Sequence, residues 1–187
     1  MKRITIIAAA AALAAAAAQA PAMAQPDPVV TARQGYELRL LGGGLAAGRR
    51  GLHSYPVFTF GIRRAEVLRR VAALRGPAGA SGPGRGCGRR PLAFTRFGTL
   101  TLWFRGDRWV GWSLTGPRTR PPIDTEYELG IGSPRGEIDV TDGDAPVFRR
   151  TARGTEFEAE GMQGLLSGLG PRARVTALWS GETCRGR

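Results

Sequence analysis

The chain has 187 residues, with 27 Lys and Arg against 15 Asp and Glu, which gives a formal net charge of +12. Its single His excludes a multi-histidine metal site, and we expect neither a metal nor another cofactor. The length suits one domain, or two small units that share a core.

The first 24 residues match a secretory signal peptide. A short positive start, Met1-Lys2-Arg3, precedes an apolar run over residues 4–18, and Ala22-Met23-Ala24 fits the A-x-A cleavage pattern. We therefore expect cleavage near Ala24 and a periplasmic or extracellular protein, with a retained signal anchor as the alternative. No Cys follows the cleavage site, so a lipid anchor of the bacterial lipoprotein kind is not expected.

Positive charge is concentrated in the first part of the mature chain. Residues 25–120 hold 17 Arg and 4 acidic residues, whereas residues 121–187 hold 8 Arg and 11 acidic residues. A segment this basic attracts anionic partners, here an envelope component, a membrane surface or an acidic protein, and we expect no nucleic acid partner in vivo. The alternative is a solvated surface without a specific partner.

Residues 25–56 predict an N-terminal segment with one strand. Tyr36 to Leu41 alternates between apolar and polar residues, and Gly42-Gly43-Gly44 ends it. The next apolar run, residues 55–60, contains Pro56 and predicts a short strand or an extended approach to a helix. His53, just before it, is expected to be a loop histidine.

Residues 62–75 predict an amphipathic helix. Glu66 precedes Arg70 by four residues, the favourable order for an ion pair, and Gly76-Pro77 ends the helix. Apolar residues recur at helical spacing, at Ile62, Ala65, Leu68, Val71 and Leu74. Residues 76–91 are rich in Gly and Pro and predict a flexible linker, because they lack the G-x-x-x-x-G-K-[ST] phosphate-binding pattern.

Residues 97–114 predict a β-hairpin and contain three of the four Trp. One strand has an apolar face of Leu100, Leu102 and Phe104, and the other an apolar set of Val110, Trp112 and Leu114. A two-residue loop at Gly106-Asp107 places Phe104 opposite Trp109, whereas a loop of three or five residues joins both apolar sets. We expect the odd-length loop, because register follows the buried face.

The other face of this hairpin is the predicted contact site. It combines Trp103 and Trp109 with Arg105 and Arg108, and aromatic and Arg side chains are enriched at binding hot spots. The alternative is that a second helix covers both Trp rings and makes them part of the core. We assign no catalytic residue.

The second half of the chain resembles the first, with residues 57–118 as one repeat and 119–187 as the other. Residues 98–116 match residues 161–181 as closing hairpins, and residues 60–67 align with 129–138. Ser133-Pro134 suits the start of a second helix, which Gly136 weakens. The pattern predicts an α+β fold of two tandem helix-plus-β-hairpin repeats, forming an antiparallel sheet with the helices packed on one face.

A family resemblance rests on Gly61, Glu66-Val67 and Gly76-Pro77. This pattern, followed by a hairpin, is similar to small envelope lipoproteins of the SmpA/OmlA type and to β-lactamase-inhibitor proteins with two such units in tandem. The chain also resembles a family of uncharacterised secreted bacterial proteins that end in L-W-x-G-x-x-C. The resemblance covers residues 57–187 and implies the repeat fold.

These observations predict a secreted, non-enzymatic binding module of the bacterial envelope, whose partner is a protein or an anionic envelope surface. The alternative is a hydrolase that acts on an envelope substrate through carboxylates such as Glu156, Glu158 and Glu160. An acidic segment at residues 139–144 lacks the spacing of a calcium loop and predicts a turn.

A disulfide between Cys87 and Cys184 is expected. These are the only two Cys, and export leads to an oxidising compartment, so an even count leaves one intramolecular pairing. The bridge ties the linker of the first repeat to the end of the second. Two free thiols or an intermolecular link are the alternatives.

Anionic vesicles or polyanions should bind the segment 25–120, and the affinity should fall steeply as salt rises. Exposed charges are screened within about 8 Å at physiological ionic strength. Co-sedimentation of the mature protein with vesicles across a salt series checks this. Binding that does not depend on salt, or no binding at low salt, contradicts it.

Overall fold

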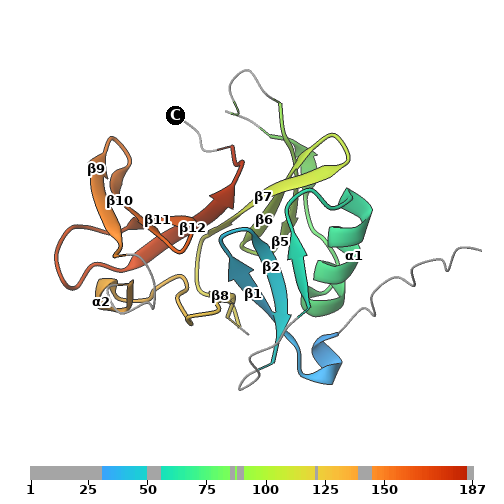
Figure 1. Ribbon diagram of the computed structural model, residues 1–187, viewed down its shortest axis with the longest axis horizontal. Helices are drawn as coiled ribbons and strands as arrows, with labels where there is room; N and C mark the ends of the chain where they lie inside the picture. The colour runs from blue at the N-terminus through green and yellow to red at the C-terminus, as the bar shows by residue number, and fades with distance from the viewer. Residues whose placement is uncertain are drawn as a thin grey trace, which may run out of the picture.

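The computed structural model describes residues 31–49, 56–84, 87, 91–120, 122–138 and 145–184. Within these residues the chain forms twelve β-strands in two sheets, two α-helices and a short 3-10 helix, Ala32–Gln34 (Figure 1). The predicted signal peptide, His53 and the acidic segment 139–144 lie outside the described residues.

The larger sheet has eight antiparallel strands in the order β4-β5-β6-β7-β12-β11-β10-β9. It consists of two four-stranded meanders that meet where β7 pairs with β12. The strands are β4 Ser81–Pro83, β5 Ala93–Phe97, β6 Leu100–Arg105, β7 Arg108–Thr115, β9 Val147–Thr151, β10 Gly154–Ala159, β11 Met162–Leu166 and β12 Val175–Gly181.

The smaller sheet has the order β3-β2-β1-β8 and contains the parallel pair β1 and β8. Its strands are β1 Glu37–Leu41, β2 Gly44–Gly48, β3 Val57–Thr59 and β8 Asp124–Thr125. The helices are α1, Arg64–Arg75, and α2, Arg135–Ile138. Figure 1 shows α1 beside the small sheet, whereas α2 lies at the other end of the molecule, near β9 to β12.

The core lies between the two sheets and α1. The large sheet contributes residues such as Leu102, Phe104 and Trp112, which have no exposed surface, and α1 contributes Val67 and Val71. Fully burying one such side chain stabilises the fold by about 1.5–3 kcal/mol. Every residue of β2 is buried, because this strand runs through the middle of the small sheet against the core.

Hydrogen bonds join the β1–β2 turn to the junction of β7 and β12. The Trp112 indole Nε1 donates to the Leu41 carbonyl at 3.0 Å. The Ser180 hydroxyl, from β12, donates to the Gly42 carbonyl and is 3.1 Å from the Gly161 carbonyl. Both side chains are buried, so these bonds satisfy polar groups that water does not reach.

The predicted α+β fold of two tandem helix-plus-hairpin repeats is wrong. The molecule is mostly β, with an eight-stranded antiparallel sheet, a second sheet and two short helices, of which α2 has only four residues. The first strand ends before Gly42-Gly43-Gly44, as predicted, but Gly44 then begins β2, a strand that the sequence did not predict. Gly44 allows this, because a Cβ there would lie 2.2 Å from the Phe58 carbonyl oxygen of β3.

The prediction of an odd-length hairpin loop is also wrong. Arg105 pairs with Arg108 across a two-residue Gly106-Asp107 turn, and Phe104 faces Trp109. A β-bulge follows, since Trp103 pairs with Gly111 and leaves Val110 as the extra residue. The bulge restores the inward direction of Trp112, so the shared apolar face forms without an odd-length loop.

Other predictions are confirmed. The first strand and the first helix form, with the helix beginning two residues later than expected. The Arg70 Nε lies 2.5 Å from Glu66 Oε1. Cys87 and Cys184 form a disulfide with a Cα–Cα distance of 4.4 Å, as an oxidising compartment permits. No helix among the described residues is long and apolar enough to cross a membrane.

Replacing Gly42 with Ala should destabilise the protein by about 1–3 kcal/mol, the usual cost of overpacking. A Cβ at Gly42 would lie 2.2 Å from the Glu160 carbonyl oxygen, so the β1–β2 turn must move away from Ser180. Thermal or urea unfolding measures the loss. Gly43→Ala is the matched control, because nothing lies within 4 Å of a Cβ there. Equal stability of the two variants contradicts the prediction.

Candidate functional site

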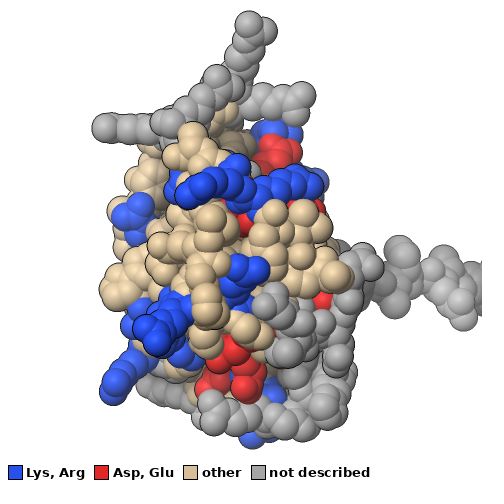
Figure 2. Space-filling model, turned by 90° about the vertical axis from the view of Figure 1, so that its left-hand side faces the viewer, with Lys and Arg blue, Asp and Glu red and all other residues tan. Residues whose placement is uncertain are grey.

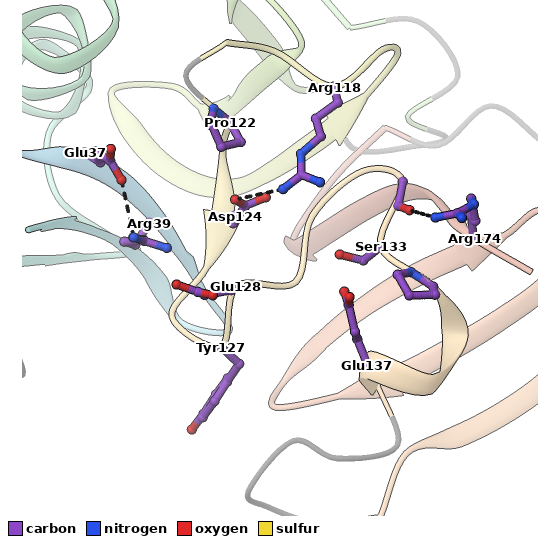
Figure 3. Close-up of a pocket in the computed structure, with 12 residues that line it drawn as sticks. Glu37, Arg39, Arg118, Pro122, Asp124, Tyr127, Glu128, Ser133, Glu137 and Arg174 are labelled. Atoms are coloured by element: carbon purple, nitrogen blue, oxygen red, sulfur yellow. Dashed lines mark hydrogen bonds and ion pairs between the residues drawn. The ribbon is translucent and has the colours of Figure 1, made fainter. Parts of the chain in front are cut away.

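A polar cleft of about 680 Å³ opens between the small sheet and the loop that precedes α2 (Figure 3). Three separate parts of the chain form its walls: strand β1, the segment 118–128 that includes β8, and the loop 132–137 with Arg174 from the end of the large sheet. Its lining residues are Glu37, Arg39, Arg118, Pro122, Asp124, Tyr127, Glu128, Gly132, Ser133, Pro134, Glu137 and Arg174.

Thr125 holds the turn that carries Tyr127 and Glu128. Its hydroxyl accepts hydrogen bonds from the Tyr127 and Leu129 backbone N–H groups, at 3.2 and 3.1 Å. Its own backbone N–H donates to the Leu129 carbonyl at 2.8 Å. Within this tight turn Glu128 adopts φ 62°, a left-handed conformation that non-glycine residues rarely take. These hydrogen bonds fix the backbone of the turn and so place Glu128 at the wall of the cleft.

The loop before α2 is tied to the start of β12. The Gly132 N–H donates to the Val175 carbonyl at 2.8 Å, and the Val175 N–H donates to the Ser133 carbonyl at 2.9 Å. The Arg174 Nη1 donates to the Gly132 carbonyl at 2.7 Å. These bonds hold Ser133 and the first turn of α2 at the edge of the cleft.

The loop before α1 is closed in the same way. The Gly61 N–H donates to the Trp109 carbonyl at 2.7 Å, and the Trp109 N–H donates to the Ile62 carbonyl at 3.1 Å. The Arg108 Nη1 donates to the Gly61 carbonyl at 2.9 Å. Arg108 thus has the same local role as Arg174, and Gly61 corresponds to Gly132. The sequence alignment of residues 60–67 with 129–138 instead paired Gly61 with Gly130, two residues earlier.

Asp124 is the most unusual charged group of the cleft. It is 7% exposed, and its Oδ1 has no hydrogen-bond partner among the described residues. Its Oδ2 lies 3.5 Å from Arg118 Nη2. Burial raises the pKa of this carboxyl, while the nearby charges of Arg118 and Arg39 act in the opposite direction. Gly130 makes the position possible, because a Cβ there would lie 1.9 Å from Asp124 Oδ1.

The two arginines beside Asp124 differ in the exposure of their side chains and in the contacts that hold them. The Arg39 side chain is 11% exposed and lies between the Glu37 carboxylate, at 3.3 Å, and the Thr125 carbonyl, at 3.4 Å. The Arg118 side chain is 54% exposed and contacts Asp124 only at ion-pair distance. Arg39 therefore belongs to the wall of the cleft, whereas Arg118 is able to turn toward a ligand.

The two predicted Trp residues lie on opposite faces of the large sheet. Trp109 is fully buried, packs edge-on against Phe60 with ring centroids 4.8 Å apart, and donates through Nε1 to the Gly111 carbonyl. Trp103 is half-buried on the outer face, where its Nε1 donates to the Ser113 hydroxyl at 2.9 Å. The two-residue turn accounts for this division, because it pairs Trp109 with Phe104 on the core face, while Trp103, the neighbour of Phe104, points to the other face.

The predicted Arg residues lie near the hairpin turn. The Arg105 side chain is 41% exposed and forms an ion pair with Glu182, beyond the end of β12. Arg108 is exposed and holds the Gly61 carbonyl. The structure brings Trp103 and Arg105 to the outer face of β6, but it does not bring Trp109 there.

A second hollow, of about 460 Å³, lies on that outer face and includes Trp103. Phe94 of β5 is the cross-strand neighbour of Trp103, with ring centroids 6.0 Å apart. The Arg96 guanidinium lies 5.7 Å from the Phe94 ring centroid. The sequence showed Trp103 but missed Phe94 and Arg96, since only the pairing of β5 with β6 joins them.

The candidate carboxylates, Glu156 and Glu158 of β10 and Glu160 after it, do not line the cleft that contains Asp124. Glu156 and Glu158 line a smaller hollow of about 220 Å³, and Glu156 pairs with Arg153 at 2.8 Å. Glu160 lies in the following turn with φ 52°. In the part of the chain that the structure describes, no group of three or more His, Cys, Asp and Glu side chains is placed to hold a metal ion.

Comparisons with family models, curated proteins and solved structures found no match to this chain.

Replacing Asp124 with Asn should change how stability depends on pH. Because burial raises the pKa of Asp124 above its ordinary value of 3.8, the folded protein holds this proton more tightly than the unfolded chain. The contribution of Asp124 is thus present in full below 3.8 and is lost as pH rises through the raised pKa. The Tm of the native protein minus that of Asp124→Asn should fall between pH 3 and neutrality. A difference that grows with pH contradicts the dominance of burial over Arg118 and Arg39.

Proposed function

We propose that this protein is a non-enzymatic binding module of the bacterial envelope, and that it contacts an anionic partner through the outer face of β5 and β6. The partner is a protein or an anionic envelope surface. The hollow formed by Phe94, Trp103 and Arg96 carries the proposal. The signal-peptide pattern and the Cys87–Cys184 disulfide support a periplasmic or extracellular location.

Trp103 suits a contact role because its ring is already held in place. The hydrogen bond to Ser113 and the neighbouring Phe94 ring restrict it in the free protein. A restrained aromatic side chain loses little conformational entropy when a partner covers it. It also offers a large apolar area, which is typical of binding hot spots.

Arginines around this hollow favour an anionic partner. Arg96 is exposed beside Phe94. The half-exposed Arg105 lies two residues after Trp103 along β6, on the same outer face. Figure 2, which shows the side of the molecule where β9, β10 and α2 lie, has further arginines in several groups separated by uncharged side chains. Those groups provide a general attraction to anions, whereas the aromatic pair supplies a localised contact.

A hydrolase that uses carboxylates is the second candidate. Asp124 favours it, because a carboxyl group whose pKa is raised by burial is suited to donate a proton. This candidate predicts turnover of an envelope substrate that Asp124→Asn abolishes and that Trp103→Ala leaves intact. The binding module predicts that Trp103→Ala weakens capture of a partner and that Asp124→Asn leaves it intact.

Trp103→Ala should weaken capture of the partner by about 30-fold, the effect of a hot-spot residue worth about 2 kcal/mol. Trp103→Phe keeps an aromatic ring and should retain most of the affinity. Arg96→Gln should weaken binding mainly at low salt. A thermal-shift screen of envelope polymers, lipids and periplasmic proteins identifies the partner, and titration of each variant measures its affinity.

Two exposed residues on β9 are matched controls. Val147→Ala removes an apolar side chain that is 46% exposed, and Arg150→Gln removes an exposed charge. Neither should affect capture by more than the general electrostatic attraction. If Trp103→Ala binds like the native protein, or if Arg150→Gln matches the loss of Arg96→Gln, the outer face of β5 and β6 is not the contact surface.

A further inference from the structure

We propose that the polar cleft beside Asp124 binds a small zwitterionic ligand, one that carries an ammonium group and an anionic oxygen group. The cleft lies away from the Trp103 hollow and shares no lining residue with it. The inference therefore goes beyond the proposed contact surface and does not depend on it.

The cleft has the size and rigidity of a small-molecule site. Its volume of about 680 Å³ falls within the range of ligand pockets. Backbone hydrogen bonds hold two of its walls, the Thr125 turn and the loop that Arg174 ties to β12. A site held in this way pays little conformational entropy when a ligand enters.

One side of the cleft is acidic. Glu128 and Glu137 are both exposed, and the Thr125 turn holds Glu128 in a left-handed conformation, a form of backbone strain found often at ligand sites. In Figure 3 the Glu137 side chain extends toward Ser133 and the space between the cleft walls. The Ser133 hydroxyl accepts a hydrogen bond from the Gly130 N–H at 3.1 Å and has its own proton to donate.

Asp124 adds an acidic group deeper in the cleft wall. It is more than nine-tenths buried, yet Oδ1 has no partner among the described residues. Oδ1 itself is buried against Gly130, where a Cβ would lie 1.9 Å from it, so Asp124 acts on the cleft through its negative charge and not through this oxygen. The exposed carboxylates of Glu128 and Glu137 are the groups that an entering ammonium group can contact directly.

The part of the cleft beside Asp124 supplies one adaptable positive group, Arg118. Arg118 is 54% exposed, and its 3.5 Å contact with Asp124 is longer than a typical charge-assisted hydrogen bond of about 2.7–2.9 Å. A guanidinium has five N–H donors, so this contact leaves others for an anionic ligand group. Arg39 and Arg174, in contrast, donate to the Thr125 and Gly132 carbonyls.

The two sides together select against ligands with one charge. A simple anion that reaches Arg118 meets the carboxylates of Glu128 and Glu137, and a simple cation that reaches these carboxylates meets Arg118. A molecule with both charges matches both sides, and the mismatch with singly charged molecules provides specificity.

Calorimetric titration of the mature protein tests the proposal with defined probes. The zwitterionic probes are glycine, 4-aminobutyrate, 6-aminohexanoate and phosphoethanolamine, which vary the separation and type of the charged groups. Butylamine and butyrate are the singly charged probes. At least one zwitterion should bind about tenfold more tightly than both of these, since each removes one charge-assisted contact.

Variants assign the two ends of the ligand. Arg118→Gln and Glu137→Gln should each weaken binding of the best zwitterion by about tenfold. In Arg118→Gln the zwitterion should lose its advantage over butylamine, and in Glu137→Gln its advantage over butyrate should shrink. Arg172→Gln and Glu158→Gln, exposed residues that do not line the cleft, are the matched controls and should bind normally.

Three results overturn the proposal. The first is no heat with any zwitterion at millimolar concentration. The second is butylamine or butyrate binding as tightly as the zwitterions, which makes the cleft a site for a single charge. The third is equal loss in the cleft variants and their controls, which indicates a general surface effect. Unchanged far-UV circular dichroism and Tm of each variant separate loss of binding from loss of fold.

Discussion

The hydrogen-bonded contact of the β1–β2 turn with the β7–β12 junction is the constraint on which the rest of the structure depends. Trp112 and Ser180, one from each strand of the junction, both donate to carbonyls of this turn. The turn fits only because Gly42 lets it approach the Glu160 carbonyl. This contact fixes the small sheet against the large one, closes the core between them and determines where β1 ends.

The position of β1 in turn creates the polar cleft. Its parallel partner β8 places Asp124 directly beside Arg39, although these residues are far apart in sequence. Burial raises the pKa of Asp124, and the paired arginines moderate that effect without satisfying Oδ1. The same geometry that completes the small sheet therefore places a buried carboxylate in the wall of an open cleft, with its unpaired oxygen packed against Gly130.

The hairpin at Gly106-Asp107 shows how the register of a two-residue turn assigns two similar residues to different faces of the sheet. Trp109 enters the core, where it packs on Phe60, while Trp103 stays on the outer face beside Phe94. Arg108 likewise serves the fold by holding the Gly61 carbonyl, whereas Arg96 and Arg105 remain on the outer face. The contact surface and the cleft thus use separate elements, and each can be tested without disturbing the other.

The sequence by itself determined the features that arise from short-range periodicity and chemistry. These are the first strand, the helix with its Glu66–Arg70 pair, the strands of the Trp-rich hairpin and the Cys87–Cys184 pairing. Only the tertiary structure decided the fold class, because pairings such as β1 with β8 and β7 with β12 join distant segments and leave no local period. The bulge at Val110 and the use of Gly44 within a strand depend on how closely a neighbouring strand approaches. For the same reason the cleft around Asp124 escaped prediction: its acidic and basic residues are individually ordinary, and they become a site only when three distant parts of the chain meet.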